Sequence, residues 1–347
     1  MNLCFNRDAR FTDWVIREDH RREPFVVIDI GVQGGESPRW GLLGDHLVLH
    51  GFDAIKEVVD ELQTKSASHP SRRYHWIAAG NENSERQFFF NRNDPYSSSM
   101  YQQGEDRFGN ARLRDEEHRR VQVRKLDTLL DEGTIPKADF LKVDVEGFEK
   151  DVFSGARKLL GSGLLGIETE SSFGVSPYYP KSHLGTLQEL LLEYRFLVFD
   201  ISFNRIPRAS FQRALQREGR SPVLDRASVG KLATLDVLFC RDLIDEADAP
   251  ENYGTPADPA TVDQIIKMMI ILELYGLNDI AVDTAERFRS RLSERLDVDH
   301  AIRLLANPFC RLSRHGALRE LLRITEQITG LRIAPALRAI RRTLKRR

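Results

Sequence analysis

The sequence of 347 residues contains few cysteines and no long apolar run. Its three cysteines, Cys4, Cys240 and Cys310, lie far apart, and no CxxC pair suggests a zinc site or a disulfide framework. The apolar stretches are too short to span a bilayer, and the first residues place Asn, Arg and Asp where a signal peptide needs apolar side chains. These absences favour a reducing compartment, so we expect a cytoplasmic protein.

Net charge is also nearly absent, because 51 Lys and Arg stand against 52 Asp and Glu. The distribution is uneven: residues 301–347 hold 12 Lys and Arg against only Glu320 and Glu326, which leaves about −11 for the rest of the chain. A composition of 41% hydrophobic and 30% charged residues is typical of folded proteins, and the length predicts two domains. A basic end on an acidic body suggests an anionic partner or self-association, and we expect no nucleic acid partner.

Short apolar runs alternate with helix-like segments between residue 25 and about residue 241. The expected strands are residues 25–30, 46–53, 74–79, 138–145, 164–170, 196–202 and 232–239. Between them, residues 54–63 and 148–160 repeat apolar side chains at helical spacing. This alternation predicts an α/β domain with a mostly parallel, Rossmann-like sheet.

The pattern changes after residue 241. Residues 242–258 are acidic and rich in Pro and Gly without an apolar period, which predicts a linker. The segments beyond it follow a helical period, and Pro259 suits the first turn of the opening helix. We therefore predict an N-terminal extension (1–24), an α/β domain (25–241), a linker (242–258) and an all-helical region (259–347).

The last twelve residues, ALRAIRRTLKRR, predict a basic amphipathic helix, with Leu337, Ile340 and Leu344 on one face. Such a helix can lie on an anionic membrane surface. It can also pack on the acidic body or on another subunit of a homo-oligomer, and we favour packing because so many other helices are predicted nearby.

The first chemical signal is a glycine-rich turn after the opening strand, in VVIDIGVQGGES. Asp29 ends the apolar strand, and Gly31, Gly34 and Gly35 follow. A turn without side chains lets a cofactor approach the backbone closely. The next strand ends at Asp53, whose carboxylate can accept hydrogen bonds from ribose hydroxyls. Together these residues predict a site for an adenosine-containing cofactor, the alternative being a turn used only for packing.

The glycine spacing helps to choose the cofactor. A dinucleotide-binding GxGxxG loop requires glycine where Gln33 stands, which disfavours NAD. An acid just before the turn suits S-adenosylmethionine, because its sulfonium and amino groups are cationic. An NAD-dependent oxidoreductase remains the alternative enzyme. A non-catalytic binding protein that keeps the same fold is a further alternative.

The second signal is a charged strand in ADFLKVDVEGFEKDVFSGA. A central parallel strand should be apolar on both faces, yet Lys142, Asp144 and Glu146 share one face by the period of two. Burying such charges without partners is costly, and violations of this kind concentrate at functional sites. The alternative is an ion pair of Lys142 with Asp144 or Glu146 at a solvated edge.

These two motifs carry a family resemblance. LKVDVEGFEKDVFSGARKLL resembles the signature of FkbM-type methyltransferases, and VVIDIGVQGG resembles the Asp-x-Gly-x-x-x-Gly cofactor loop of the same family. The likeness covers roughly residues 25–241. It implies a class I methyltransferase fold that uses S-adenosylmethionine to methylate a hydroxyl on a sugar, a glycan or a natural product.

The resemblance also implies roles for single residues. The implied contacts are Asp29, Gly31 and Gly35 in the cofactor loop, Asp53 at the ribose, and Asp144 with Glu146 near the transferred methyl. The family loop often reads Gly-Ala-Asn-x-Gly, from which Val32 and Gln33 depart.

Methyl transfer to an alcohol needs alignment of the reacting atoms and a base that takes the hydroxyl proton. Asp144 is the leading candidate. Glu168 and Glu170 share a face at the end of the next predicted strand, so two acid pairs converging there would raise a pKa or recruit a cation. A divalent metal is therefore an alternative that we do not favour. His183 is a weaker candidate base.

Two polar loops suit recognition of a small-molecule or glycan acceptor. The loop of residues 91–103 contributes the hydroxyls of Ser98 and Ser99. The loop of residues 176–183 contributes Tyr178, Tyr179 and Lys181, which are suited to a lid or to acceptor binding.

Overall fold

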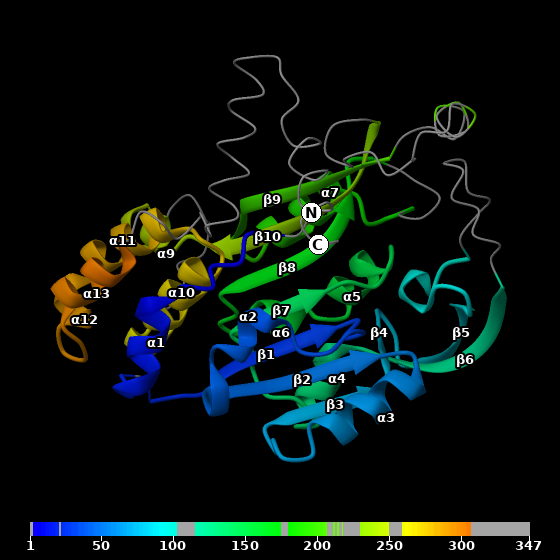
Figure 1. The fold of residues 1–347 in the computed structure, drawn as a ribbon, viewed down its shortest axis with the longest axis horizontal. Helices are drawn as coiled ribbons and strands as arrows, with labels where there is room; N and C mark the ends of the chain where they lie inside the picture. The colour runs from blue at the N-terminus through cyan, green and yellow to red at the C-terminus, as the bar shows by residue number, and fades with distance from the viewer. Residues whose placement is uncertain are drawn as a thin grey trace, which may run out of the picture.

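The computed structural model describes residues 3–20, 22–102, 115–174, 180–206, 230–249 and 259–306, together with residues 211, 214 and 217. Within these ranges, the main sheet has seven strands in the order β3-β2-β1-β7-β8-β10-β9 (Figure 1). The bounds are β1 (Phe25–Ile30), β2 (Leu47–Asp53), β3 (Arg72–Trp76), β7 (Phe140–Val143), β8 (Gly166–Ser172), β9 (Phe196–Ile206) and β10 (Lys231–Arg241). Strands β3, β2, β1, β7 and β8 are mutually parallel, and β10 is antiparallel to β8 and β9.

This order is that of a Rossmann-like sheet in which an antiparallel strand, β10, lies between the last two of the other strands. The predicted fold class is confirmed. Each apolar run contributed a strand because the sheet is covered on both faces. Along β1, for example, Phe25 and Val27 enter one hydrophobic core, and Val26 and Ile28 enter the other.

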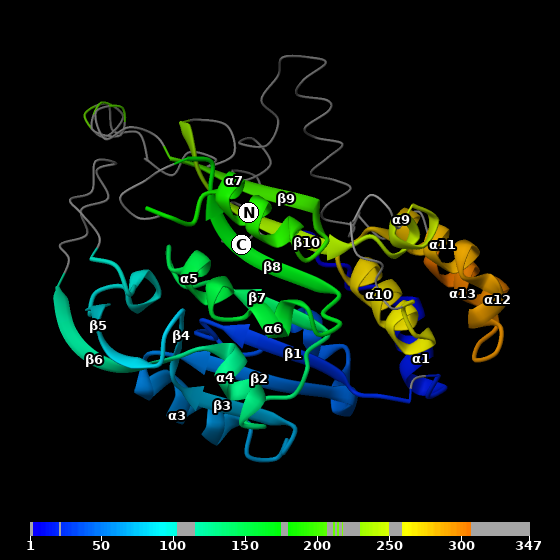
Figure 2. The same cartoon turned by 180° about the vertical axis from the view of Figure 1, so that it is seen from behind.

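Helices cover the sheet and extend from one end of it. The helices are α1 (Arg10–Arg17), α2 (Pro38–Gly41), α3 (Lys56–Lys65), α4 (Leu126–Asp131), α5 (Glu149–Ser154), α6 (Arg157–Leu160), α7 (Leu184–Leu192), α9 (Leu243–Asp248), α10 (Val262–Leu274), α11 (Asn278–Arg287), α12 (Arg289–Leu292) and α13 (Val298–Leu305), with short 3-10 turns η1 (Gly44–His46) and η2 (Pro95–Ser97). In Figure 1, α1 and α9 to α13 form a group beyond the amino ends of β1 and β2. Figure 2 shows the same group of helices from behind. Every described helix is too short or too polar to cross a lipid bilayer.

The helical region packs on the sheet. One hydrophobic core joins Phe25 and Phe140 of the sheet to Trp40 of α2 and to Ile266 and Met269 of α10. Regular structure in residues 259–306 is entirely helical, as the sequence predicts. Because this core is shared, the boundary between the α/β and helical regions stays a prediction.

Two local predictions were wrong. Residues 243–248, predicted as part of a linker, form α9, because the Asp242 carboxylate accepts the backbone N–H of Ile244 and Asp245 at the helix start. The single helix predicted over 148–160 is divided into α5 and α6. The division lies at Gly155, where a Cβ would be 1.9 Å from the carbonyl oxygen of Gly80. Residues 250–258 and the basic segment within 307–347 lie outside the described residues.

A second sheet of three strands was not predicted. Its strands are β4 (Ala78–Ala79), β5 (Ser84–Asn91) and β6 (Glu116–Arg124), in the order β4-β6-β5. Strand β6 is mostly charged, and its buried Val121 and Val123 are too few to mark it in the sequence. This small sheet lies beyond the carboxyl ends of β1 and β2 (Figure 1), where it forms a wall of the candidate site.

Candidate functional site

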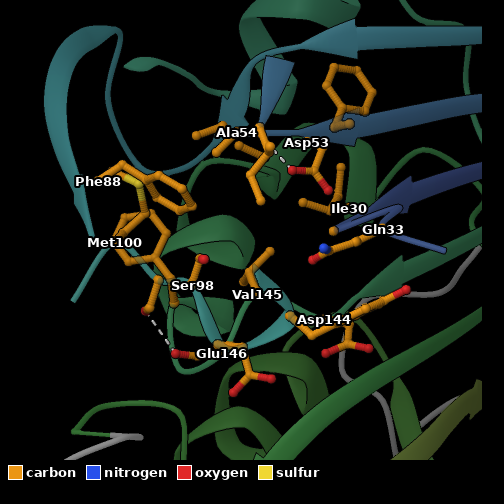
Figure 3. Close-up of a pocket in the computed structure, with 18 of the residues that line it drawn as sticks. Ile30, Gln33, Asp53, Ala54, Phe88, Ser98, Met100, Asp144, Val145 and Glu146 are labelled. Atoms are coloured by element: carbon orange, nitrogen blue, oxygen red, sulfur yellow. Dashed lines mark hydrogen bonds between the residues drawn. The ribbon is translucent and has the colours of Figure 1, made fainter. Parts of the chain in front are cut away.

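A pocket lies at the carboxyl ends of β1, β2 and β7, with the small sheet and η2 on its outer side (Figure 3). The edge of a parallel sheet formed by these strand ends is where ligands bind in Rossmann-like folds. The lining residues are Ile30, Gly31, Gln33, Phe52, Asp53, Ala54, Ile55, Ile77, Ala78, Ala79, Phe88, Pro95, Tyr96, Ser98, Ser99, Met100, Asp144, Val145, Glu146 and Phe148.

The turn after β1 is fixed between its two neighbouring strands. Gly31 has φ +82°, and a Cβ there would lie 1.9 Å from the carbonyl oxygen of Asp144. The backbone N–H groups of Gly31 and Val32 both donate to the carbonyl of Phe52, at 2.9 and 3.1 Å. Only glycine fits this position. Gly34 and Gly35 complete the turn without lining the pocket.

Asp53 enters the pocket from the end of β2. Its Oδ1 accepts the backbone N–H of Ile55 at 2.8 Å, which fixes the carboxylate at the start of α3. Burial raises the pKa of Asp53 from 3.8 to about 6. Figure 3 shows the Gln33 side chain lying between Asp53 and Asp144. The ends of three adjacent strands thus present polar groups to one space.

Three charged residues lie next to one another across the sheet, with Lys142 on β7 in register with Asp29 on β1 and Glu168 on β8. The Lys142 Nζ lies 3.2 Å from Asp144 Oδ2 and 3.5 Å from Asp29 Oδ1. Burial lowers the pKa of Lys142, but the neighbouring carboxylates raise it above its ordinary value. The ion pair between Lys142 and Asp144, which was the alternative interpretation of these charges, is therefore present at the edge of the pocket.

Asp29 lies beneath the glycine turn and does not line the pocket. It is 2% exposed, and burial raises its pKa to about 6, although Lys142 opposes this shift. The contacts of Asp29 in the structure are thus with the charged row, and its predicted role toward a cofactor stays a prediction.

The loop after β7 is held from three sides. Glu146 has φ +52°, a left-handed conformation that is uncommon outside glycine. Ser99 donates to the carbonyl of Glu146 at 2.9 Å, and Ser182 donates to that of Gly147 at 2.8 Å. The buried Glu149 accepts the backbone N–H of Gly147 at 3.0 Å. These contacts fix the backbone that presents Asp144 and Glu146.

Glu149 is a site-supporting residue that sequence reasoning missed. It is buried, and burial raises its pKa to about 7. Its signal in the sequence is an acid on the apolar face of the helix that follows the charged strand. Gln33, Ile55, Tyr96 and Met100, all in the pocket lining, were also missed. Gln33 and Ile55 adjoin recognised motif residues, whereas Tyr96 and Met100 depend on how the loop of residues 91–103 folds.

The two predicted acid pairs converge only in part. Ligand atoms of Asp144, Glu146 and Glu170 lie within 4.8 Å of one another, a spacing at which carboxylates could hold a divalent cation. Glu168 instead binds elsewhere: its Oε2 accepts from Arg39 Nη1 at 3.0 Å and from the Tyr275 hydroxyl. Use of a metal stays a prediction that we do not favour.

The remaining predicted residues have other local contacts. His183 caps α7 by accepting the backbone N–H of Thr186, and it does not line the pocket. Ser98 and Ser99 line the pocket, although Ser98 Oγ also accepts the backbone N–H of Asn91. Lys181 is exposed, 3.9 Å from Asp151. Tyr178 and Tyr179 lie outside the described residues.

Comparison with known proteins gives one family and several solved structures. Residues 43–196 match the model of the methyltransferase FkbM domain. The sequence matches no curated protein. Among solved structures, methyltransferase FkbM from Methylobacillus flagellatus is similar at 14% identity and a TM-score of 0.37, over 67% of this chain and 48% of that one. The chain thus corresponds to about half of that protein.

Two further structures have lower scores. An O-methyltransferase from Bacillus cereus, solved in complex with SAH, is similar at 11% identity and a TM-score of 0.31, over 67% of this chain and 80% of that one. The 1,6-didemethyltoxoflavin-N1-methyltransferase of Burkholderia thailandensis has the same identity and TM-score, over 68% and 79%. These values are low, and the likenesses support no conclusion about activity.

The family match includes the end of β2 with Asp53, the small sheet, and the whole charged motif of residues 138–156. The turn after β1 precedes it and closes the same pocket. The match to the methyltransferase FkbM domain over residues 43–196 thus covers two of the three strand ends that line the pocket.

Proposed function

We propose that the protein is an S-adenosylmethionine-dependent methyltransferase that methylates a hydroxyl of a sugar, glycan or natural-product acceptor. One observation carries the proposal: the Gly31 turn and the carboxylates of Asp53 and Asp144, which follow three adjacent strand ends, line one pocket. We further propose that it acts in the cytoplasm on a small-molecule or glycan acceptor.

The residues fit an adenosine-bearing cofactor. Asp53 would accept hydrogen bonds from the ribose hydroxyls, and the apolar side chains of Ile55, Ile77 and Phe88 offer a slot for a planar base. Gly31 adds backbone to the same lining, without a side chain. When bound, the cofactor supplies a methyl group activated by a sulfonium.

We propose Asp144 as the base. Its side chain is 44% exposed and faces the pocket, while Lys142 holds it by an ion pair at 3.2 Å. A carboxylate held on one side can accept the proton of an acceptor hydroxyl on the other. Glu146, Ser98 and Ser99 belong to the same lining, and the Ser99 hydroxyl donates to the carbonyl of Glu146. This polar wall is suited to an acceptor that carries several hydroxyls.

Isothermal titration calorimetry with S-adenosylmethionine, S-adenosylhomocysteine and NAD tests the cofactor. We expect the first two to bind. Asp53→Ala should weaken binding by about 10- to 100-fold, because charge-assisted hydrogen bonds contribute about 1.5–3 kcal/mol. Asp53→Asn should lose less, since an oxygen remains for the backbone N–H of Ile55. Asp60→Ala is the control, because Asp60 is exposed on α3.

The outcomes separate the alternatives. Binding of NAD alone would favour an oxidoreductase, and binding of none of the three would overturn the proposal. Incubation with labelled S-adenosylmethionine and a cell extract then identifies the acceptor. Cofactor binding without any labelled product would favour the non-catalytic binding protein.

A further inference from the structure

Arg39 and Tyr275 meet on a single carboxylate oxygen. Glu168 Oε2 accepts from Arg39 Nη1 at 3.0 Å and from the Tyr275 hydroxyl. The guanidinium carbon of Arg39 lies 3.8 Å from the centroid of the Tyr275 ring, and Nη2 donates to the carbonyl of Cys4 at 3.0 Å. The side chains of Arg39 and Glu168 are only 7% and 16% exposed. The three side chains therefore form a tightly packed polar unit inside the fold.

This unit adjoins the lysine at the edge of the pocket. Glu168 stands opposite Lys142 in the β7–β8 register, and Lys142 forms its ion pairs with Asp29 and Asp144. Three carboxylates on adjacent elements thus surround one ammonium group. Asp236 on β10 adds a fourth acid nearby, and burial raises its pKa to about 7. Which of these carboxylates forms an ion pair with Lys142 depends on the partners that the other carboxylates have.

We propose that Arg39 and Tyr275 are positioning residues that hold Glu168 away from Lys142. Lys142 thereby keeps its ion pair with Asp144 and fixes the orientation of the carboxylate that faces the cofactor. The inference rests on the proposed function, in which Asp144 lies near the sulfonium. Arg39 comes from α2, and Tyr275 ends α10 of the helical region. The helical region thereby supports the site, although most of it lies at the opposite end of the sheet.

Electrostatics explains why the arrangement depends on Arg39. A carboxylate that is largely removed from water needs a cation, because leaving one partner of a buried pair uncompensated is strongly unfavourable. Without Arg39, Glu168 would take Lys142, which is its neighbour in register. Asp144 would then lose its ion pair and its fixed orientation.

The test compares four variants with the wild type by calorimetry, using the ratio of the S-adenosylhomocysteine and S-adenosylmethionine dissociation constants. This ratio reports the charge around the sulfur, since the two compounds differ by the sulfonium. Arg39→Met should raise the ratio by about threefold, because the site gains negative charge. Arg39→Met with Glu168→Gln should restore it. Tyr275→Phe, which removes no charge, should raise it less, and Tyr74→Phe, at a buried tyrosine of β3 outside the pocket lining, should leave it unchanged.

Crystal structures of the variants decide whether the lysine moves. In Arg39→Met, Lys142 Nζ should lie within about 4 Å of Glu168 and should have left Asp144. In the double variant, Lys142 should again form its ion pair with Asp144. Lys142 remaining on Asp144 in Arg39→Met, or a ratio that the second substitution does not restore, would overturn the proposal.

Two provisions keep the result clear. If Arg39→Met does not fold, Tyr275→Phe carries the comparison, because it removes one of the two groups that hold Glu168 without changing the charge. If the wild type binds neither compound, the proposed function has failed. The position of Lys142 in the crystal structures then still decides whether Arg39 and Tyr275 hold Glu168.

Discussion

Strand β7 has an acid just beyond each end, and the two acids are used in opposite ways. Asp139, before the strand, is 8% exposed; both its oxygens lie 2.9 Å from Lys267 Nζ, and Oδ2 accepts the backbone N–H of Val26 at 2.7 Å. Asp144, after the strand, is far more exposed and is held by Lys142 on one side. Both oxygens of Asp139 are therefore paired inside the fold, whereas Asp144 is paired with Lys142 and also lines the pocket.

The difference follows from what covers each end. Helix α10 packs against the amino ends of the strands and contributes Lys267, so an acid there must be neutralised within the core. At the carboxyl ends, the loop after β7 is held through its backbone by Ser99, Ser182 and Glu149. The loop backbone is thereby fixed, and Asp144 and Glu146 line the pocket.

The largest expected effect is at the carboxyl end, in Gly31→Ala. The added Cβ would lie 1.9 Å from the Asp144 carbonyl oxygen at a φ of +82°, so the variant should lose more than about 4 kcal/mol of unfolding free energy or fail to fold. Gly44→Ala is the matched control. Its φ is also positive, but no atom lies within 4 Å of the added Cβ, so it should cost about 1 kcal/mol. Equal losses in urea denaturation would show that the close approach to Asp144 is not what requires glycine.

At the amino end, Lys267→Met should cost about 3–4 kcal/mol, because it leaves the buried Asp139 carboxylate without its cation. The folded variant should bind S-adenosylhomocysteine as the wild type does. Lys56→Met, which removes an exposed ion pair with Asp60, should change stability by less than about 1 kcal/mol. Weaker ligand binding without a loss of stability would contradict the division between the two ends of β7.

Much of the site was predictable because its signals are local in sequence. The apolar runs gave the strands, the Gly31 turn follows the first of them, and Asp53 ends the second. The strand predicted over residues 138–145 was too long at its carboxyl end. Strand β7 ends at Val143, and the period of two does not continue into a residue with φ +52°.

Other features depend on partners far along the chain. Glu168 reads as a candidate catalytic acid from sequence, yet its contacts come from Arg39, 129 residues away, and Tyr275, 107 residues away. The break between α5 and α6 depends on Gly80 in the same way. The small sheet was missed because the side chains of β6 are mostly charged. The hydrophobic periodicity of a single segment cannot predict such contacts between residues far apart in the sequence.

The smallest expected effect concerns Asp53, a second acid at the carboxyl edge. In the described part of the chain it forms no ion pair with a lysine or arginine, and burial raises its pKa from 3.8 to about 6. The folded state therefore holds this proton more tightly than the unfolded chain, so the contribution of Asp53 to stability falls as the pH rises from about 4 through about 6. Asp53→Asn removes the buried charge and should be more stable than the wild type by about 2–3 kcal/mol at pH 8, with a much smaller difference at pH 4. Thermal unfolding of both proteins across this pH range measures the difference in stability. A difference independent of pH would show that the pKa of Asp53 is not raised in the folded state. The acid at the carboxyl edge would then be as well neutralised as Asp139 at the amino edge.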